Sequence, residues 1–172
     1  MTPEQAKFML QTLLPQIEAE QKITRRIISA VPVDKGDYRP AARSRSALEL
    51  AWHIAATEMW FLDSVAKGNF SPDEGDDMPT EIKNSADVVE WYDKHFAANL
   101  KRVEVLPEDH LSKPINFYNA YNYPAVFYLL FLLKHSIHHR GQLSAYLRPM
   151  GAKVPNIYGG SADEPFQAAA QA

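Results

Sequence analysis

The chain contains 172 residues, of which 46% are hydrophobic and 23% are charged, and this composition is typical of one domain with an apolar core. Its net charge of -3 provides no general positive field, so nucleic acid is not an expected partner. Since cysteine is absent, the chain has no disulfide, no cysteine zinc site and no thiolate nucleophile of its own.

Neither the polar residues 1–4 nor any apolar run predicts a targeting or membrane-spanning segment. The most apolar stretch, residues 125–133, is much shorter than the roughly 20 residues that span a bilayer. We therefore expect a cytoplasmic protein with no membrane partner.

The first predicted helix begins at Thr2 and continues to about Ala30. Thr2 and Gln5 form a capping box, and a proline occupies the first helical position. Apolar residues then recur at amphipathic spacing, which is typical of a helix with one buried face. Pro15 interrupts this pattern, and we expect it to kink the helix or to reset its start.

Two further helices are predicted over residues 46–66 and 85–105. Ser46 and Glu49 form a second capping box at the start of the earlier of these helices. Proline and glycine mark the segments before and between the two helices as loops, beginning with residues 31–45.

The last predicted helix begins at Pro124 and ends near Arg148, after an aromatic loop over residues 106–123. No run of alternating polar and apolar residues predicts a strand. Four long helices joined by loops predict an all-α fold, a four-helix bundle. We expect one domain over residues 1–160 and a loose C-terminal tail over residues 161–172.

Three of the six histidines lie on the last predicted helix, at positions 135, 138 and 139. Viewed along the helix axis, His139 lies about 40° from His135, and His138 lies about 60° in the opposite direction. His135 and His139 project toward the apolar side of the helix, whereas His138 lies toward its edge. That side carries the residues Tyr128, Leu132, Gln142, Leu143 and Tyr146.

Two imidazoles one helical turn apart can chelate one metal ion, because both side chains lie over the same patch of surface. His53 lies in another strongly apolar helix and is the expected third ligand. We therefore predict one divalent metal ion held by His53, His135 and His139. Spacing alone leaves open a second interpretation, in which each histidine is a core residue whose ring nitrogens form hydrogen bonds.

Other histidine motifs are excluded by the residues around the pair. The zincin pattern H-E-x-x-H requires a glutamate directly after the first histidine, but Ser136 follows His135. The E-x-x-H pair of ferritin-like proteins requires a glutamate three residues before a histidine, where Leu132 and Ser136 stand. The remaining option is one metal ion on three histidines, with Glu58 as the candidate catalytic base.

Two segments of the chain resemble the DinB superfamily of bacterial bundle proteins. They are Glu49-Leu50-Ala51-Trp52-His53-Ile54, followed by Glu58, and His135-Ser136-Ile137-His138-His139-Arg140-Gly141-Gln142-Leu143. The resemblance implies a four-helix bundle, a homodimer, and metal ligands at His53, His135 and His139. It also implies a stress response, because the family name comes from damage-inducible expression, and chemistry with bacillithiol, mycothiol or glutathione.

Three functions are compatible with such a site. The leading hypothesis is a transferase that binds zinc, nickel, iron or manganese and joins a low-molecular-weight thiol to an electrophilic substrate. The second is a metal-dependent hydrolase using bound water, whose pKa zinc lowers to about 7. The third is a non-catalytic stress-response or binding protein with a structural metal. Structural sites usually have four protein ligands, and only three are predicted, which favours a reactive site.

Overall fold

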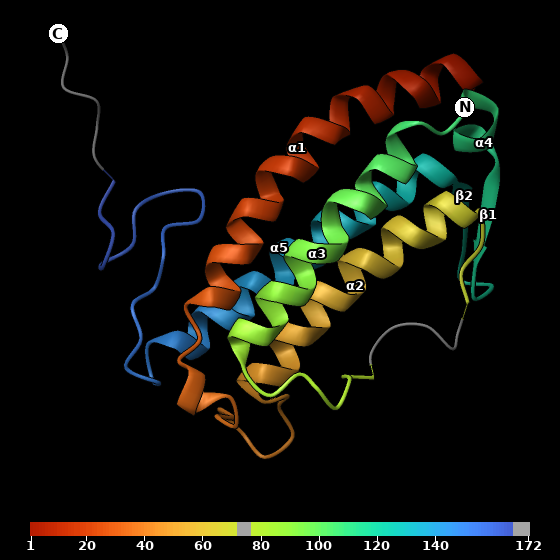
Figure 1. The fold of residues 1–172 in the computed structure, drawn as a ribbon. Coiled ribbons are helices and arrows are strands. Elements are labelled where there is room, and N and C mark those ends of the chain that lie inside the picture. Colours follow the sequence, from red (N-terminus) through yellow and green to blue (C-terminus); the bar gives the residue numbers. More distant parts are fainter. Residues whose placement is uncertain (72–76, 167–172) are drawn as a thin grey trace, which may run out of the picture.

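The computed structural model describes residues 1–71 and 77–166, and these residues are mostly helical (Figure 1). The long helices are α1 (Pro3–Ser29), α2 (Ala47–Lys67), α3 (Ser85–Glu104) and α5 (Tyr128–Leu147). The shorter elements are η1 (Val33–Lys35), α4 (Glu108–Ser112), β1 (Pro114–Phe117), β2 (Tyr121–Pro124) and η2 (Ala125–Phe127). No helix within the described residues combines the length and apolar character needed to cross a bilayer.

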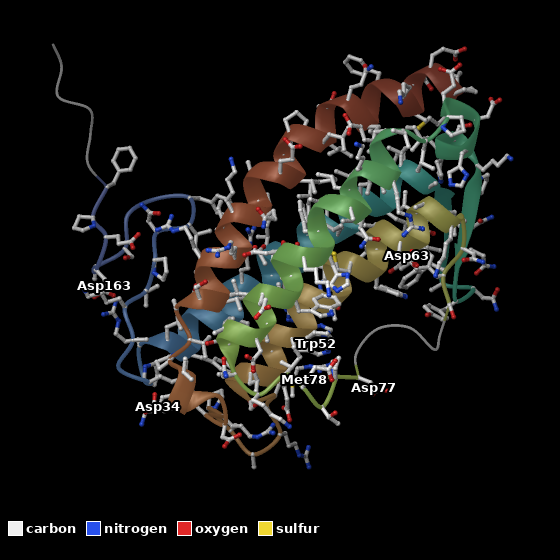
Figure 2. The ribbon with its side chains drawn as sticks, in the orientation of Figure 1. Asp34, Trp52, Asp63, Asp77, Met78 and Asp163 are labelled. Carbon is white, nitrogen blue, oxygen red and sulfur yellow. The ribbon has the colours of Figure 1, made fainter. Side chains whose placement is uncertain are left out.

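The long helices lie side by side, with α2 packed against both α3 and α5, and α1 packed against the same two helices (Figure 1). The helices α1, α3 and α5 each bury one face, whereas α2 is buried or partly buried on all sides, and their apolar residues form a common core. At the edge between α2 and α3, Arg102 and Lys67 form ion pairs with Asp63, which is labelled in Figure 2. The helix α2 therefore lies between the two other helices and brings its side chains close to α5.

The helix boundaries follow local capping signals. The capping boxes at Thr2 and at Ser46 are confirmed, and a third box at Asn84 starts α3. Pro15 lies inside α1, which is continuous, so of the two effects expected of this proline the new helix start does not occur. The helix α2 ends at Gly68, whose φ of 80° lies in the left-handed region that glycine adopts without strain.

A β-hairpin and the short helix α4 occupy the segment that we predicted as an aromatic loop. The strands pair antiparallel, with Ile115 opposite Tyr123, so the prediction of an all-α chain without strands was wrong here. Residues 118–120 connect the strands, and Tyr118 and Asn119 have positive φ values of 51° and 58°, as the two central residues of a type I′ turn require. Ile115 is the buried residue of the pairing, so no alternation of polar and apolar residues marked the strands.

The segment after α5 returns along the C-terminal part of α1 (Figure 1). Arg26 on α1 forms hydrogen bonds with Asn156 and Glu164, and Arg148 forms an ion pair with Asp163, which is labelled in Figure 2. Of the tail predicted from residue 161, Ser161, Asp163 and Glu164 form such hydrogen bonds. Residues 167–172 of that tail lie outside the described residues.

We predict that Gly68→Ala destabilises the protein by about 1–2 kcal/mol, because an L-residue is strained in the left-handed region. The new Cβ would also lie 3.2 Å from Cε1 of His110. Urea unfolding followed by circular dichroism measures the change. Gly159→Ala is the matched control, since its added Cβ meets no atom within 4 Å. Equal free energies of unfolding for Gly68→Ala, Gly159→Ala and the wild type would contradict the left-handed conformation of Gly68.

Candidate metal centre

Three histidines from α2 and α5 converge at the interface of these helices. One ring nitrogen from each of His53, His135 and His139 lies within 4.8 Å of the other two. Nε2 of His135 lies 3.1 Å from Nε2 of His53. All three residues are partly buried, so the cluster lies at the edge of the core. The structure thus brings together the three residues that the sequence singles out.

These distances fit a shared metal ion. Metal–nitrogen bonds of 2.0–2.1 Å at tetrahedral angles place two ligand nitrogens about 3.3 Å apart. The 3.1 Å between His53 and His135 is close to that value and also fits a hydrogen bond between the two rings. His139 supplies the third ring, with its centroid 4.3 Å from that of His135 and 4.6 Å from that of His53. Three imidazoles around one point are a donor set that suits several divalent transition metals.

Neighbouring side chains orient two of the rings. Nδ1 of His139 lies 3.0 Å from Oε1 of Gln142, an oxygen that only accepts hydrogen bonds. A proton on Nδ1 donates to this oxygen, and this tautomer leaves the lone pair of His139 on Nε2, where it can bind a metal. Nδ1 of His53 lies 3.4 Å from the hydroxyl oxygen of Thr57, one turn along α2. Such outer contacts fix the tautomer and orientation of metal-binding imidazoles.

The surroundings of His139 favour its neutral, metal-binding form. Burial lowers the pKa of His139, and the nearby His53, His138 and Arg45 lower it further, while the hydrogen bond to Gln142 opposes them. A metal ligand must be deprotonated, so a lowered pKa reduces the cost of binding. His138 itself is exposed and is not part of the convergent group, as its position at the edge of the helix predicts.

Glu58 is placed differently from the histidines. Its side chain is buried, and its carboxylate accepts hydrogen bonds from the hydroxyls of Thr24, at 2.9 Å, and Tyr92. Burial raises the pKa of Glu58, against the effect of those hydrogen bonds. The carboxylate thus faces α1 and α3 in the core, and the structure does not bring it into the group of ligand nitrogens.

The buried charge of Arg140, which lies in the same part of the core as Glu58, was not predicted from the sequence. Arg140 is completely buried and lies between α5 and α1, where it contacts Glu20 and Thr24. The signal was available, because Arg140 lies about 140° from His135 around the helix, in the middle of its apolar face. A charged residue at such a position needs buried partners.

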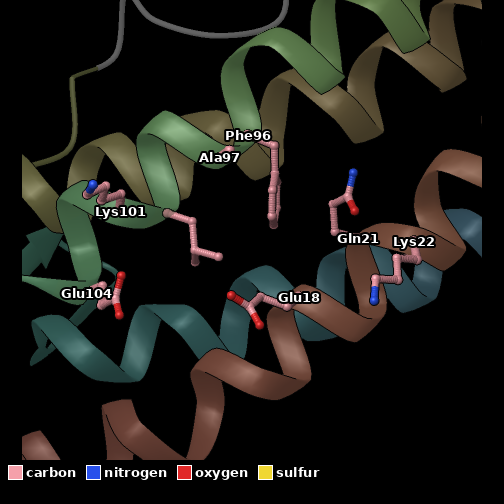
Figure 3. A pocket seen from close by; sticks show the side chains of 8 residues that line it. Glu18, Gln21, Lys22, Phe96, Ala97, Lys101 and Glu104 are labelled. Carbon is pink, nitrogen blue, oxygen red and sulfur yellow. The ribbon is translucent and has the colours of Figure 1, made fainter.

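A separate cavity of about 380 Å³ lies between α1 and α3 (Figure 3). It is lined by the apolar side chains of Phe96 and Leu100 and by charged side chains such as Lys22 and Glu104. None of its lining residues comes from α2 or α5. It therefore does not belong to the histidine cluster.

Comparison with known proteins places the chain among similar bacterial sequences. The model of the DinB family matches residues 4–168. The uncharacterized protein YjoA of Bacillus subtilis (strain 168) is 29% identical over 135 residues, which cover 77% of this chain and 85% of YjoA.

Solved structures of DinB-like proteins share the fold. The alignment with the crystal structure of YjoA covers 86% of this chain and 97% of the YjoA chain, with a TM-score of 0.70 and 25% sequence identity. A DinB-like protein from Bacillus cereus ATCC 10987 has the same coverage, a TM-score of 0.71 and 20% identity. The alignment with the mycothiol-dependent maleylpyruvate isomerase covers 85% of this chain and 64% of the isomerase chain, with a TM-score of 0.54 and 13% sequence identity. At this identity, the likeness shows a similar fold only.

We predict that His53→Ala and His135→Ala each abolish stoichiometric metal binding, because two remaining imidazoles hold an ion far more weakly than three. His138→Ala is the control and should leave binding largely intact, since this exposed ring lies outside the cluster. Metal analysis after purification without a histidine tag, followed by calorimetric titration with Zn²⁺, measures the effect. Loss of binding in His138→Ala together with retention in His139→Ala would contradict the assignment of the ligands.

Proposed function

Because the chain belongs to the DinB family, we propose that it binds one divalent metal ion through His53, His135 and His139 and transfers a low-molecular-weight thiol to an electrophilic substrate. The observation that carries this proposal is the convergence of three partly buried imidazoles from two helices. The four long helices, packed around one core, support the finer description of the fold as a four-helix bundle.

The donor set favours a reactive site over a structural one. Three protein ligands leave coordination positions for an exogenous molecule, whereas structural zinc sites are usually closed by four. A bound divalent ion supplies Lewis acidity, which lowers the pKa of a coordinated thiol or water. The thiol must come from outside, because the chain contains no cysteine.

The residues of the chain have separate tasks in this proposal. His53, His135 and His139 are the ligands, and Gln142 keeps the proton of His139 on Nδ1. Glu58 was our candidate base, but it is hydrogen-bonded in the core, and a base must reach the proton that it abstracts. We therefore propose no protein base for the transfer.

One structural neighbour, whose own activity depends on a thiol, supports a thiol as the cosubstrate. That neighbour is the mycothiol-dependent maleylpyruvate isomerase, which shares the fold at 13% identity. Two other functions use the same three ligands, namely a hydrolase that activates bound water and a stress-response protein whose metal only joins α2 to α5. Zinc, nickel, iron and manganese all suit three imidazoles, so the ligands alone do not select the metal.

We predict that turnover requires both the metal and an added thiol, since the protein supplies no nucleophile of its own. A panel of electrophiles is assayed with bacillithiol, mycothiol, glutathione or no thiol, each with metal-free and metal-loaded protein. His135→Ala, incubated with the same amount of metal, is the control, because any turnover that it shows comes from metal that is not bound at the site. Metal-dependent turnover without thiol would replace the transferase by the hydrolase, and no turnover under any condition would favour the non-catalytic protein.

We also propose a homodimer that forms through the outer face of α5. Ile137 on this face is 42% exposed, and the hairpin tyrosines Tyr121 and Tyr123, whose rings pack near Phe131 of α5, are 44% and 40% exposed. A Cβ added to Gly141 meets no atom within 4 Å, so a second helix has room to approach closely there. Apolar surface of this kind often marks an interface between identical chains.

Ile137→Glu should convert the dimer into a monomer, because it places a charge in the proposed apolar interface. Light scattering at micromolar concentration should give twice the chain mass of 19.4 kDa for the wild type and a single chain mass for the variant. Phe8→Glu adds a charge at an apolar residue that is 71% exposed on α1, and it should remain dimeric. A monomeric wild type would end this proposal without affecting the metal centre.

A further inference from the structure

Arg140 carries a charge into the core directly beside a proposed metal ligand. Its side chain is completely buried, and it follows His139 on α5. Nη1 donates hydrogen bonds to the backbone oxygen of Glu20, at 2.9 Å, and to the hydroxyl of Thr24, at 3.4 Å. Nη2 forms an ion pair with the Glu20 carboxylate and donates to the hydroxyl of Tyr158, at 2.6 Å. The guanidinium thus fastens α5 to α1 with a planar group of several donors.

The same network reaches the other helix that carries a ligand. The Thr24 hydroxyl, which accepts from Arg140, donates to Oε1 of Glu58 on α2 at 2.9 Å. Tyr92 on α3 donates to Oε2 of the same carboxylate. Residues of all four long helices therefore meet in one buried network, and Thr24 links α2 with α5. Breaking any of these contacts leaves a buried polar group without its partner, which opposes movement of the helices.

The metal centre is sensitive to the rotation that this network opposes. His139 and Arg140 are consecutive, so any rotation of α5 about its axis turns both side chains by the same angle. A rotation of about 15° moves an atom about 5 Å from the axis by about 1.3 Å. Metal–ligand distances tolerate only about 0.2 Å. Holding Arg140 in place therefore fixes the direction in which His135 and His139 project toward His53.

We propose that Arg140 is a positioning residue of the metal centre, anchored by Glu20 and Thr24 so that the rotation of α5 suits three-histidine coordination. This inference rests on the proposed metal site. Arg140 itself faces away from the ligand nitrogens, because it projects about 100° from His139 around the helix. Its effect on the ion is therefore exerted through the orientation of the helix.

The test compares Co²⁺ binding by the wild type, Arg140→Met and Thr24→Val, since Co²⁺ reports its ligand geometry in the visible spectrum. Both variants should bind Co²⁺ about 10- to 100-fold more weakly, the range known for residues that orient metal ligands, and should show altered absorption bands. Arg148→Met is the control, because Arg148 is an exposed arginine near the end of the same helix, and its spectrum and affinity should match the wild type. All measurements are made at a temperature where circular dichroism shows each protein fully folded.

If Arg140→Met does not fold, Thr24→Val still tests the proposal. Valine has nearly the volume of threonine, so this variant removes the hydrogen bonds of the hydroxyl without changing the packing much. Wild-type affinity and spectrum in every folded variant of the network would overturn the proposal. A metal-free readout separates this outcome from failure of the metal site itself, namely nuclear Overhauser contacts between the ring protons of His53 on α2 and those of His135 on α5. The wild type should show these contacts, since the two ring centroids lie 4.9 Å apart, and Arg140→Met should weaken them. If the wild type binds no metal, the proposed function fails, and unchanged contacts in Arg140→Met overturn the positioning role as well.

Discussion

The proposed metal centre depends on one geometric constraint, which is that ring nitrogens from two different helices must converge within a few ångströms of one point. His135 and His139 meet this condition locally, because they lie one turn apart on α5. His53 meets it only if α2 and α5 pack at the right distance and rotation, as the 3.1 Å between the two Nε2 atoms of His53 and His135 shows. The apolar core brings the two helices together, but apolar contacts alone tolerate small rotations. The buried network of Arg140, Thr24 and Glu58 adds the directional contacts that such a core lacks.

The parts of this structure that the sequence predicted are those that local rules determine. The capping boxes at Thr2 and Ser46 start their helices where the hydrogen-bonding rules place them. The assignment of His135 and His139 to one side, with His138 at the edge, followed from helical periodicity and the pattern of apolar residues. His53 could be chosen because it is the histidine on another strongly apolar helix, and the resemblance to DinB proteins agreed.

The parts that the sequence did not predict depend on contacts between distant residues. The hairpin of β1 and β2 is too short and too exposed to leave an alternating pattern, since Ile115 is its buried residue. The buried network joins residues as far apart as Glu20 and Arg140, and no local rule states which carboxylate will meet which arginine. Glu58 was considered as a base because its position on α2 does not reveal its distant partners. In the structure, its carboxylate accepts hydrogen bonds from Thr24 and Tyr92 in the core.

The central claim is that three histidines from two helices hold one divalent ion, and X-ray absorption spectroscopy at the edge of the bound metal tests it most directly. The protein is purified without a histidine tag and measured as isolated. The account predicts one metal per chain, with three imidazole nitrogens at about 2.0–2.1 Å and the remaining positions filled by water oxygens or by the sulfur of an added thiol. A chain that takes up no stoichiometric metal, or an ion with fewer than three imidazole ligands, would contradict it.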